Sequence, residues 1–188
     1  MDETVNKHGQ LAVVIVGFFS TVLVLVAQST AEAAPAARLA LTLAAALACA
    51  VRYWWVILLL PWPLQWFRLV LILSAWSLLP FIALLATDAR RWVLALAALA
   101  AIGFVTEVFN TLTGQWRIGS DALQRSLKRD HVAGAGAAAL ATIILLAVSA
   151  WPWPALGWLV LAMVVADWVR LVVMIRRHER LLAEERSA

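Results

Sequence analysis

The sequence contains a series of apolar runs long enough to cross a lipid bilayer, and the last of them constrains the chain most. It covers residues 151–175, and Asp167 and Arg170 lie well inside it. About 20 helical residues cross the hydrocarbon core of a membrane, so this run predicts a transmembrane helix. An ionisable side chain within such a helix is costly, and it usually faces a partner or a polar cavity. We therefore expect other charged residues of the chain to meet Asp167 and Arg170.

The composition also favours a membrane protein. Hydrophobic residues make up 64% of the 188 residues and charged residues only 14%, whereas a soluble domain has about 45–50% and about 25%. The apolar runs are continuous and do not alternate with polar residues, which favours helices over the strands of a membrane barrel. The sequence therefore predicts an all-α, polytopic transmembrane helical bundle that forms a single integral membrane domain over residues 1–188.

Six helices are expected, over residues 11–30, 37–60, 64–87, 92–112, 132–150 and 155–175. The first run ends in a sequence that resembles a signal-peptide cleavage site, but its acidic N-terminal residues favour a retained membrane helix. Proline lacks a backbone N–H and clashes with the preceding helical turn, so Pro61 and Pro63 separate the second helix from the third. Pro80 predicts a kink in the third helix. A five-helix alternative places a re-entrant or tilted segment within residues 37–87.

The two halves of the sequence, residues 11–87 and 92–175, share a pattern. In each half a Pro-Trp-Pro sequence precedes two tryptophans ten residues apart, Trp66 and Trp76 in the first and Trp158 and Trp168 in the second. Three crossings per half give the halves opposite orientations, as in inverted-repeat transporters. Tryptophan also gathers at membrane interfaces and proline at helix starts, which explains the spacing without a repeat. An inverted three-plus-three repeat is therefore one hypothesis for this chain.

Basic residues predict the orientation of the helices. With six crossings and a cytoplasmic N-terminus, the cytoplasmic side receives nine Lys and Arg residues, and the outer side receives three, Arg38, Arg90 and Arg91. Both termini are then cytoplasmic, and residues 176–188 form a cytoplasmic tail. Arg greatly outnumbers Lys and Ala is abundant, which is typical of a GC-rich bacterial genome. We therefore expect a multi-pass protein of the bacterial inner membrane.

Five charged residues within the apolar runs fall at a similar depth under this topology, about 7–14 Å inside the cytoplasmic boundary at about 1.5 Å per residue. They are Arg52, Arg68, Glu107, Asp167 and Arg170. One hypothesis is a network that forms a substrate, ion or proton site, extended by Asn110. The other is structural: the arginines reach the headgroups, and Asp167 pairs with Arg170 three residues later. The two acids fit the structural hypothesis least well, because short side chains cannot reach the headgroups.

The longest polar segment covers residues 113–131 and predicts a short helix after Ser120, a favourable N-cap residue. Leu123 and Leu127 lie on one side of it, and Arg125, Lys128 and Arg129 lie around it. Such a helix lies on anionic headgroups or docks a partner subunit.

The helix that follows this segment includes Gly134 and Ala138, whose spacing lets helices approach closely, within the chain or in a homo-oligomer.

Several kinds of site are disfavoured. All three histidines lie outside the apolar runs, which argues against haem held by membrane histidines. The sequence has neither an HExxH motif nor a pair of cysteines, so no metal site or other cofactor is predicted. The basic residues lie in loops beside apolar runs, as in a membrane protein rather than a nucleic-acid-binding protein. An enzyme that acts on a lipid-linked substrate through Glu107 or Asp167 is the least favoured of three functional hypotheses.

Two functions fit the sequence better. The first is a small transporter, channel or substrate-binding membrane subunit, with the five charged residues as its polar site. The alternative is a non-catalytic accessory or assembly subunit of a larger membrane complex, surrounded by lipids and docked to a protein partner. The chain length and the six-helix plan resemble the substrate-binding subunits of energy-coupling-factor vitamin importers, in architecture alone and without matching motif residues.

Overall fold

The computed structural model describes residues 35–59, 66–113, 121–150 and 155–187, and these residues contain helices and no strand. The elements are α2 (Pro35–Leu59), α3 (Trp66–Leu84), the short 3-10 helix η1 (Leu85–Thr87), α4 (Ala89–Thr113), α5 (Asp121–Ala150) and α6 (Leu156–Ser187). All five α-helices are long and apolar enough to cross a membrane. Over the described residues the predicted helical bundle is confirmed, and its five long apolar helices are those of a multi-pass membrane protein.

The helix count is confirmed in part. The predicted helix over residues 11–30 and both Pro-Trp-Pro sequences lie outside the described residues, so the six-helix count stays a prediction. Within residues 37–87 the chain forms two long antiparallel helices, α2 and α3, in place of the re-entrant segment of the five-helix alternative. Pro80 lies inside α3, and its predicted kink stays a prediction.

The repeat also stays a prediction. An inverted repeat of residues 11–87 and 92–175 relates α2 to α5 and α3 to α6. Among the described helices, α2 packs along α6, but α5 and α3 make no comparable contact. The packing of these helices therefore lends the repeat no support.

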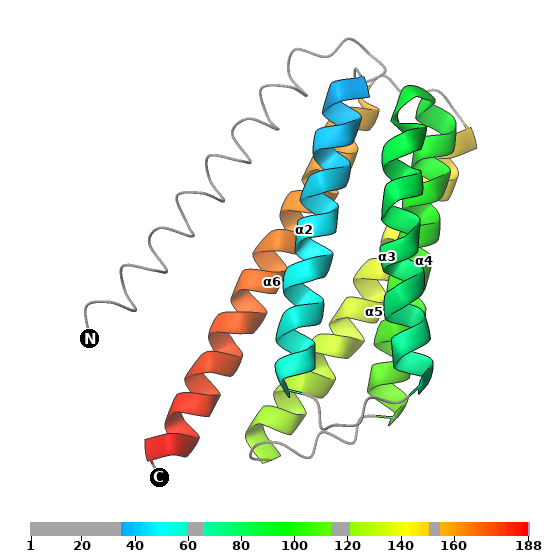
Figure 1. Ribbon diagram of the computed structural model, residues 1–188. Coiled ribbons are helices and arrows are strands. Elements are labelled where there is room, and N and C mark those ends of the chain that lie inside the picture. Colours follow the sequence, from blue (N-terminus) through cyan, green and yellow to red (C-terminus); the bar gives the residue numbers. More distant parts are fainter. Residues whose placement is uncertain (1–34, 60–65, 114–120, 151–154, 188) are drawn as a thin grey trace.

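The helices run up and down the bundle (Figure 1). Helices α2, α4 and α6 point in one direction, and α3 and α5 point in the other. We call the end of the bundle at which α2, α4 and α6 finish the tail end. Helix α5 packs mainly along α4, and α2 packs mainly along α6. This pairing leaves a space in the middle of the bundle that all five helices help to enclose.

Small residues bring the helices together around the core. On α2, Ala37, Leu41, Ala44 and Ala48 recur at helical spacing and are almost completely buried. Because alanine is short, a large side chain of a neighbouring helix reaches the backbone of α2: the indole N–H of Trp168 donates to the Ala44 carbonyl oxygen at 3.1 Å. The small side chains on this face of α2 therefore allow α6 to pack close to it.

Trp92 and Thr42 form a second contact of this kind. Trp92, in the first turn of α4, is fully buried. Its indole N–H donates to the Thr42 hydroxyl oxygen at 2.9 Å, and that hydroxyl in turn donates to the Arg38 carbonyl oxygen at 2.8 Å. A tryptophan N–H in an apolar core needs such an acceptor, because an unpaired buried donor is costly. The contact fixes the start of α4 against α2.

The outer surface of the bundle is apolar. Large hydrophobic side chains point outward on several helices, for example Leu43 on α2, Leu73 on α3, Ile143 on α5 and Val173 on α6, which are 50–64% exposed. Scattered apolar residues occur on any protein surface, but apolar surface that continues around the bundle matches lipid rather than water. The lateral surface is therefore suited to the hydrocarbon core of a membrane.

Helix α5 corrects one expectation. Residues 121–131 do not form a separate surface helix, because α5 continues without interruption from Asp121 to Ala150. Leu123 and Leu127 are buried and form a small core with Trp55. The apolar side of this segment therefore packs within the chain, and Arg125, Lys128 and Arg129 remain exposed.

Helix α6 also extends past the last apolar run, to Ser187. Residues 176–187 of the predicted tail therefore continue the last helix.

Candidate functional site

A cavity of about 440 Å³ lies in the middle of the bundle. Alanine, leucine and valine side chains from α2, α4, α5 and α6 line most of it, together with Ala75 of α3. Its polar residues gather at one end, on the turns nearer to the tail end. A mostly apolar cavity of a few hundred Å³ with a few convergent polar groups is the usual form of a small-molecule site.

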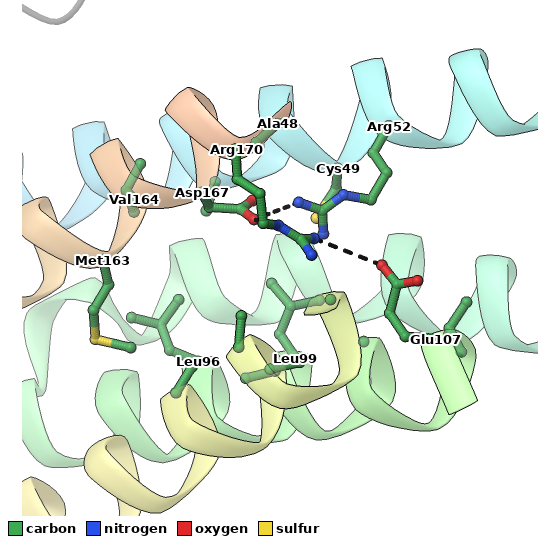
Figure 2. Close-up of a pocket in the computed structure, with 18 of the residues that line it drawn as sticks. Ala48, Cys49, Arg52, Leu96, Leu99, Glu107, Met163, Val164, Asp167 and Arg170 are labelled. Carbon is green, nitrogen blue, oxygen red and sulfur yellow. Dashed lines mark hydrogen bonds and ion pairs between the residues drawn. The ribbon is translucent and has the colours of Figure 1, made fainter. Parts of the chain in front are cut away.

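Four charged residues meet at the polar end of the cavity. A guanidinium N–H of Arg52 on α2 donates to the carboxylate of Asp167 on α6. Arg170, one turn further along α6, lies 3.7 Å from Asp167 (Nε to Oδ1) and 3.7 Å from Glu107 of α4 (Nη2 to Oε1). Figure 2 shows Arg170 between the two acids, with Met163, Leu96 and Leu99 along the apolar part of the cavity. Two positive and two negative side chains therefore share one site on three helices.

His131 is the fifth member of this group. Its Nδ1 contacts the Glu107 carboxylate, and both side chains are buried. Sequence analysis missed His131 because it precedes the apolar part of its helix. One signal was available: His131, Gly134 and Ala138 are spaced by three and four residues and so lie on the same helical face. We call Arg52, Glu107, His131, Asp167 and Arg170 the charged cluster.

Asn110 was also predicted to belong to the site. It lies one turn beyond Glu107 on α4, is 5% exposed and lines the cavity. Among the described residues, no hydrogen-bond donor reaches its side-chain oxygen. Buried amide oxygens in proteins are generally hydrogen-bonded, so Asn110 has an acceptor available for a ligand or a water molecule.

Arg68 does not line the cavity. It is buried on α3 near the tail end, where its guanidinium donates to the Thr113 hydroxyl at 3.4 Å and lies 5.8 Å from the centre of the Phe109 ring. A guanidinium at this distance from an aromatic ring makes a favourable cation–π contact. The prediction that Arg68 joins the other four charged residues is therefore wrong. Its contacts on α4 lie nearer to the tail end than Glu107 does.

Gly134 allows the charged cluster to form. A Cβ atom at this position would lie 2.7 Å from Arg170 Nη1 and 2.8 Å from the Glu107 carboxyl group. Atoms do not approach this closely, so any side chain at position 134 would displace Arg170 or Glu107. The close approach predicted for Gly134 thus occurs within the chain and brings α5 against the charged cluster.

We expect Gly134→Ala to disrupt this arrangement. The added methyl group meets the ends of Glu107 and Arg170, which are flexible side chains and can turn aside, so we expect the lower end of the cost of overpacking, about 1 kcal/mol. Gly136→Ala is a matched control on the same helix, because a Cβ there meets no atom within 4 Å. Thermal denaturation of the detergent-purified variants measures the difference. Equal melting temperatures for the two variants would contradict the close packing at Gly134.

A second polar group lies toward the tail end. The Trp55 indole N–H donates to His178 Nδ1 at 3.2 Å, so His178 carries its proton on Nε2, which donates to Asp130 at 3.0 Å. Arg177 also donates to Asp130, at 2.8 Å. Although sequence analysis placed His178 in the tail, it is completely buried. These contacts join α2, α5 and α6 below the charged cluster.

The cavity opens on the side between α5 and α6. Leu140 of α5 lines the cavity and is 58% exposed, and Ala137 and Ala166 are also exposed lining residues. The polar contacts between α5 and α6 lie nearer to the tail end, at Asp130. Among the described helices, this is the side on which the cavity is least covered.

Comparisons with protein families, with curated proteins and with solved structures give no match for this chain. The cavity and the charged cluster are therefore the features of the molecule that bear on its function.

Proposed function

We propose that this protein binds an amphiphilic small molecule in the cavity, as a transporter or as the substrate-binding membrane subunit of one. The observation that carries this proposal is the form of the cavity: an apolar chamber of about 440 Å³ that ends at the charged cluster. The apolar part suits the body of the ligand, and the charged end suits its head group. The opening between α5 and α6 suits a ligand that enters from the bilayer.

The position of the charged cluster inside the bundle supports a functional role. Charged residues inside a membrane helix are costly and mark ligand or ion pathways in many membrane proteins. A purely structural contact needs only one ion pair, such as Arg52 with Asp167. The chain adds Glu107, Arg170 and His131 on three helices, and it keeps position 134 as glycine beside them. We propose that this further set serves the ligand.

A cavity-filling variant tests the proposal. Ala100 of α4 lines the cavity, and Ala98, two residues earlier, is exposed on the outer surface. Ala100→Phe fills the cavity without changing a charge, whereas Ala98→Phe adds the same ring toward the lipid. We expect Ala100→Phe to abolish saturable binding and Ala98→Phe to retain it.

The measurement uses the protein in zwitterionic lipid nanodiscs, with empty nanodiscs as the blank. The probes share a naphthalene ring and differ in their polar group: naphthalene sulfonate, naphthalene methanol and naphthylmethyl trimethylammonium. Isothermal titration calorimetry gives the stoichiometry. Binding that survives in Ala100→Phe, or saturable binding of none of the three probes to the wild type, would reject the cavity as the site.

The accessory-subunit hypothesis has one observation in its favour. Arg125, Lys128 and Arg129 are exposed near the tail end, where a partner protein or anionic headgroups can reach them. A wild-type protein that binds none of the probes but purifies with a stoichiometric partner would favour this alternative.

The proposed location is the bacterial inner membrane, with both termini in the cytoplasm. The described helices support this orientation through their basic residues. At the tail end lie Arg125, Lys128, Arg129, Arg176, Arg177 and Arg180, and at the opposite end lie Arg38, Arg90 and Arg91. Basic residues favour the cytoplasmic side, so the tail end is the proposed cytoplasmic end.

A further inference from the structure

We propose that the ligand carries an anionic head group and that the Glu107–His131 pair takes up one proton when this ligand binds. The inference rests on the proposed function, because it concerns the ligand of the same cavity. Two features support it: the net charge of the side chains that line the site, and the fact that protonation is the change of charge open to them near neutral pH.

The charged cluster is neutral when His131 is neutral. Arg52 and Arg170 contribute two positive charges, and Glu107 and Asp167 contribute two negative charges. The other ionisable side chains that line the cavity, Cys49 and Tyr53 of α2, are uncharged at neutral pH. Asp130 lies outside the cavity and contacts Arg177 and His178. A ligand with a net charge therefore leaves an uncompensated charge in a medium of low dielectric constant, which is costly.

Near neutral pH the site can balance the charge of a ligand in only one way, by taking up a proton. Histidine is the side chain that titrates in this range, and its titration adds a positive charge. The arginines do not lose their protons. The cluster can therefore gain a positive charge to balance an anion, but it cannot lose one to balance a cation. The proton joins the Glu107–His131 pair, whose two side chains are in contact and can hold it between them.

The hydrogen-bonding groups point to the same ligand class. Asp167 already accepts from Arg52 and lies beside Arg170, and Glu107 contacts both His131 and Arg170. Among the described residues, the Nε–H groups of Arg52 and Arg170 have no hydrogen-bond acceptor. Both carboxylates thus already contact positively charged or imidazole groups, while each guanidinium group has an N–H that can still donate a hydrogen bond. An anionic oxygen of a ligand can accept hydrogen bonds from these N–H groups, whereas a cationic ligand would be repelled by the two arginines.

The balance of the binding step is simple. One ligand anion and one proton from solution enter the site, the proton binds at the Glu107–His131 pair, and the complex is neutral. With His131 protonated, Glu107 pairs with the imidazolium, and Arg170, which is 3.7 Å from Glu107, turns to the ligand. No covalent bond to the ligand forms or breaks. A protein that carries the ligand across the membrane by this step moves an anion together with a proton.

The pH dependence of binding tests the inference. Naphthalene sulfonate keeps its charge at all relevant pH values, so a proton taken up on binding belongs to the protein. For wild-type protein in nanodiscs, we expect the Kd for this probe to rise about tenfold for each pH unit over the range in which the free protein lacks this proton. Titration calorimetry in two buffers of different ionisation enthalpy should show one proton taken up per sulfonate bound. The trimethylammonium probe should bind at least tenfold more weakly than the sulfonate.

Glu107→Gln is the decisive variant. It removes one negative charge and gives the cluster the net charge that protonation gives the wild type. We expect it to bind the sulfonate with no proton uptake and with a Kd that does not depend on pH. Glu179→Gln, an exposed glutamate on α6, is the matched control and should behave as the wild type.

The outcomes separate the two proposals. Saturable sulfonate binding without proton uptake by the wild type overturns this inference and leaves the proposed function standing. Preferential binding of the cation does the same. Binding of none of the three probes rejects the proposed function, and the inference falls with it. Should Glu107→Gln fail to assemble, the proton count of the wild type still decides the question.

Discussion

Replacing Asp167 with Asn is expected to lower the free energy of unfolding by about 1–3 kcal/mol, between the values for exposed and for buried ion pairs. The substitution leaves Arg52 without the carboxylate to which it donates and Arg170 without one of its two acids. The intermediate value applies because the side chains of Arg52 and Asp167 are partly buried, with 21% and 37% exposed. Thermal denaturation in detergent measures the loss.

Asp88→Asn is the matched control. Asp88 pairs with Arg91 on the surface, and its carboxylate accepts the Arg91 backbone N–H at the start of α4. Exposed ion pairs contribute little, and Asn caps a helix about as well as Asp, so we expect a change within about 0.5 kcal/mol. A double variant in which Arg52 and Asp167 both become Leu should regain most of the stability that Asp167→Asn loses, since no buried charge is left unpaired. Equal stability of Asp167→Asn and Asp88→Asn would contradict the interior ion pair.

Trp92→Ala is expected to destabilise the bundle by about 3–5 kcal/mol. Trp92 is completely buried where α4 starts, and its removal leaves a large void against α2. Trp92→Phe keeps most of the volume but removes the bond to Thr42, and should cost about 1 kcal/mol. Trp66→Ala controls for the loss of a tryptophan, because Trp66 is 77% exposed. The same denaturation experiment ranks the three variants, and a loss for Trp66→Ala as large as that for Trp92→Ala would contradict the core.

Much of the fold could be predicted because the membrane limits what a chain can form. A run of about 20 apolar residues must be a helix to satisfy its own backbone in lipid, so the apolar runs locate the helices. The described helices begin and end within a few residues of the predicted ranges, except at the start of α5 and the end of α6. Residues 121–131 were misjudged because their polar composition resembles a loop. Their leucines are nevertheless buried against α2 and α6.

The candidate site was predictable in part for a similar reason. Position along a helix fixes the depth of a residue in the membrane, so Arg52, Glu107, Asp167 and Arg170 were correctly placed at one level. Depth does not fix the direction in which a side chain points around the bundle, and that direction depends on how the helices pack. Arg68, on α3, lies against Phe109 instead of the cavity. His131 was missed because the apolar run, taken as the limit of the membrane helix, excluded it.

Gly134 has a consequence for how this protein varies among its relatives. The space that a Cβ atom would fill at this position is taken by the ends of Glu107 and Arg170. A chain with the same fold and a larger residue at this position cannot keep both charged side chains in place. Positions 107, 134 and 170 should therefore change together in evolution, and a sequence that keeps all three is expected to keep the charged cluster as well.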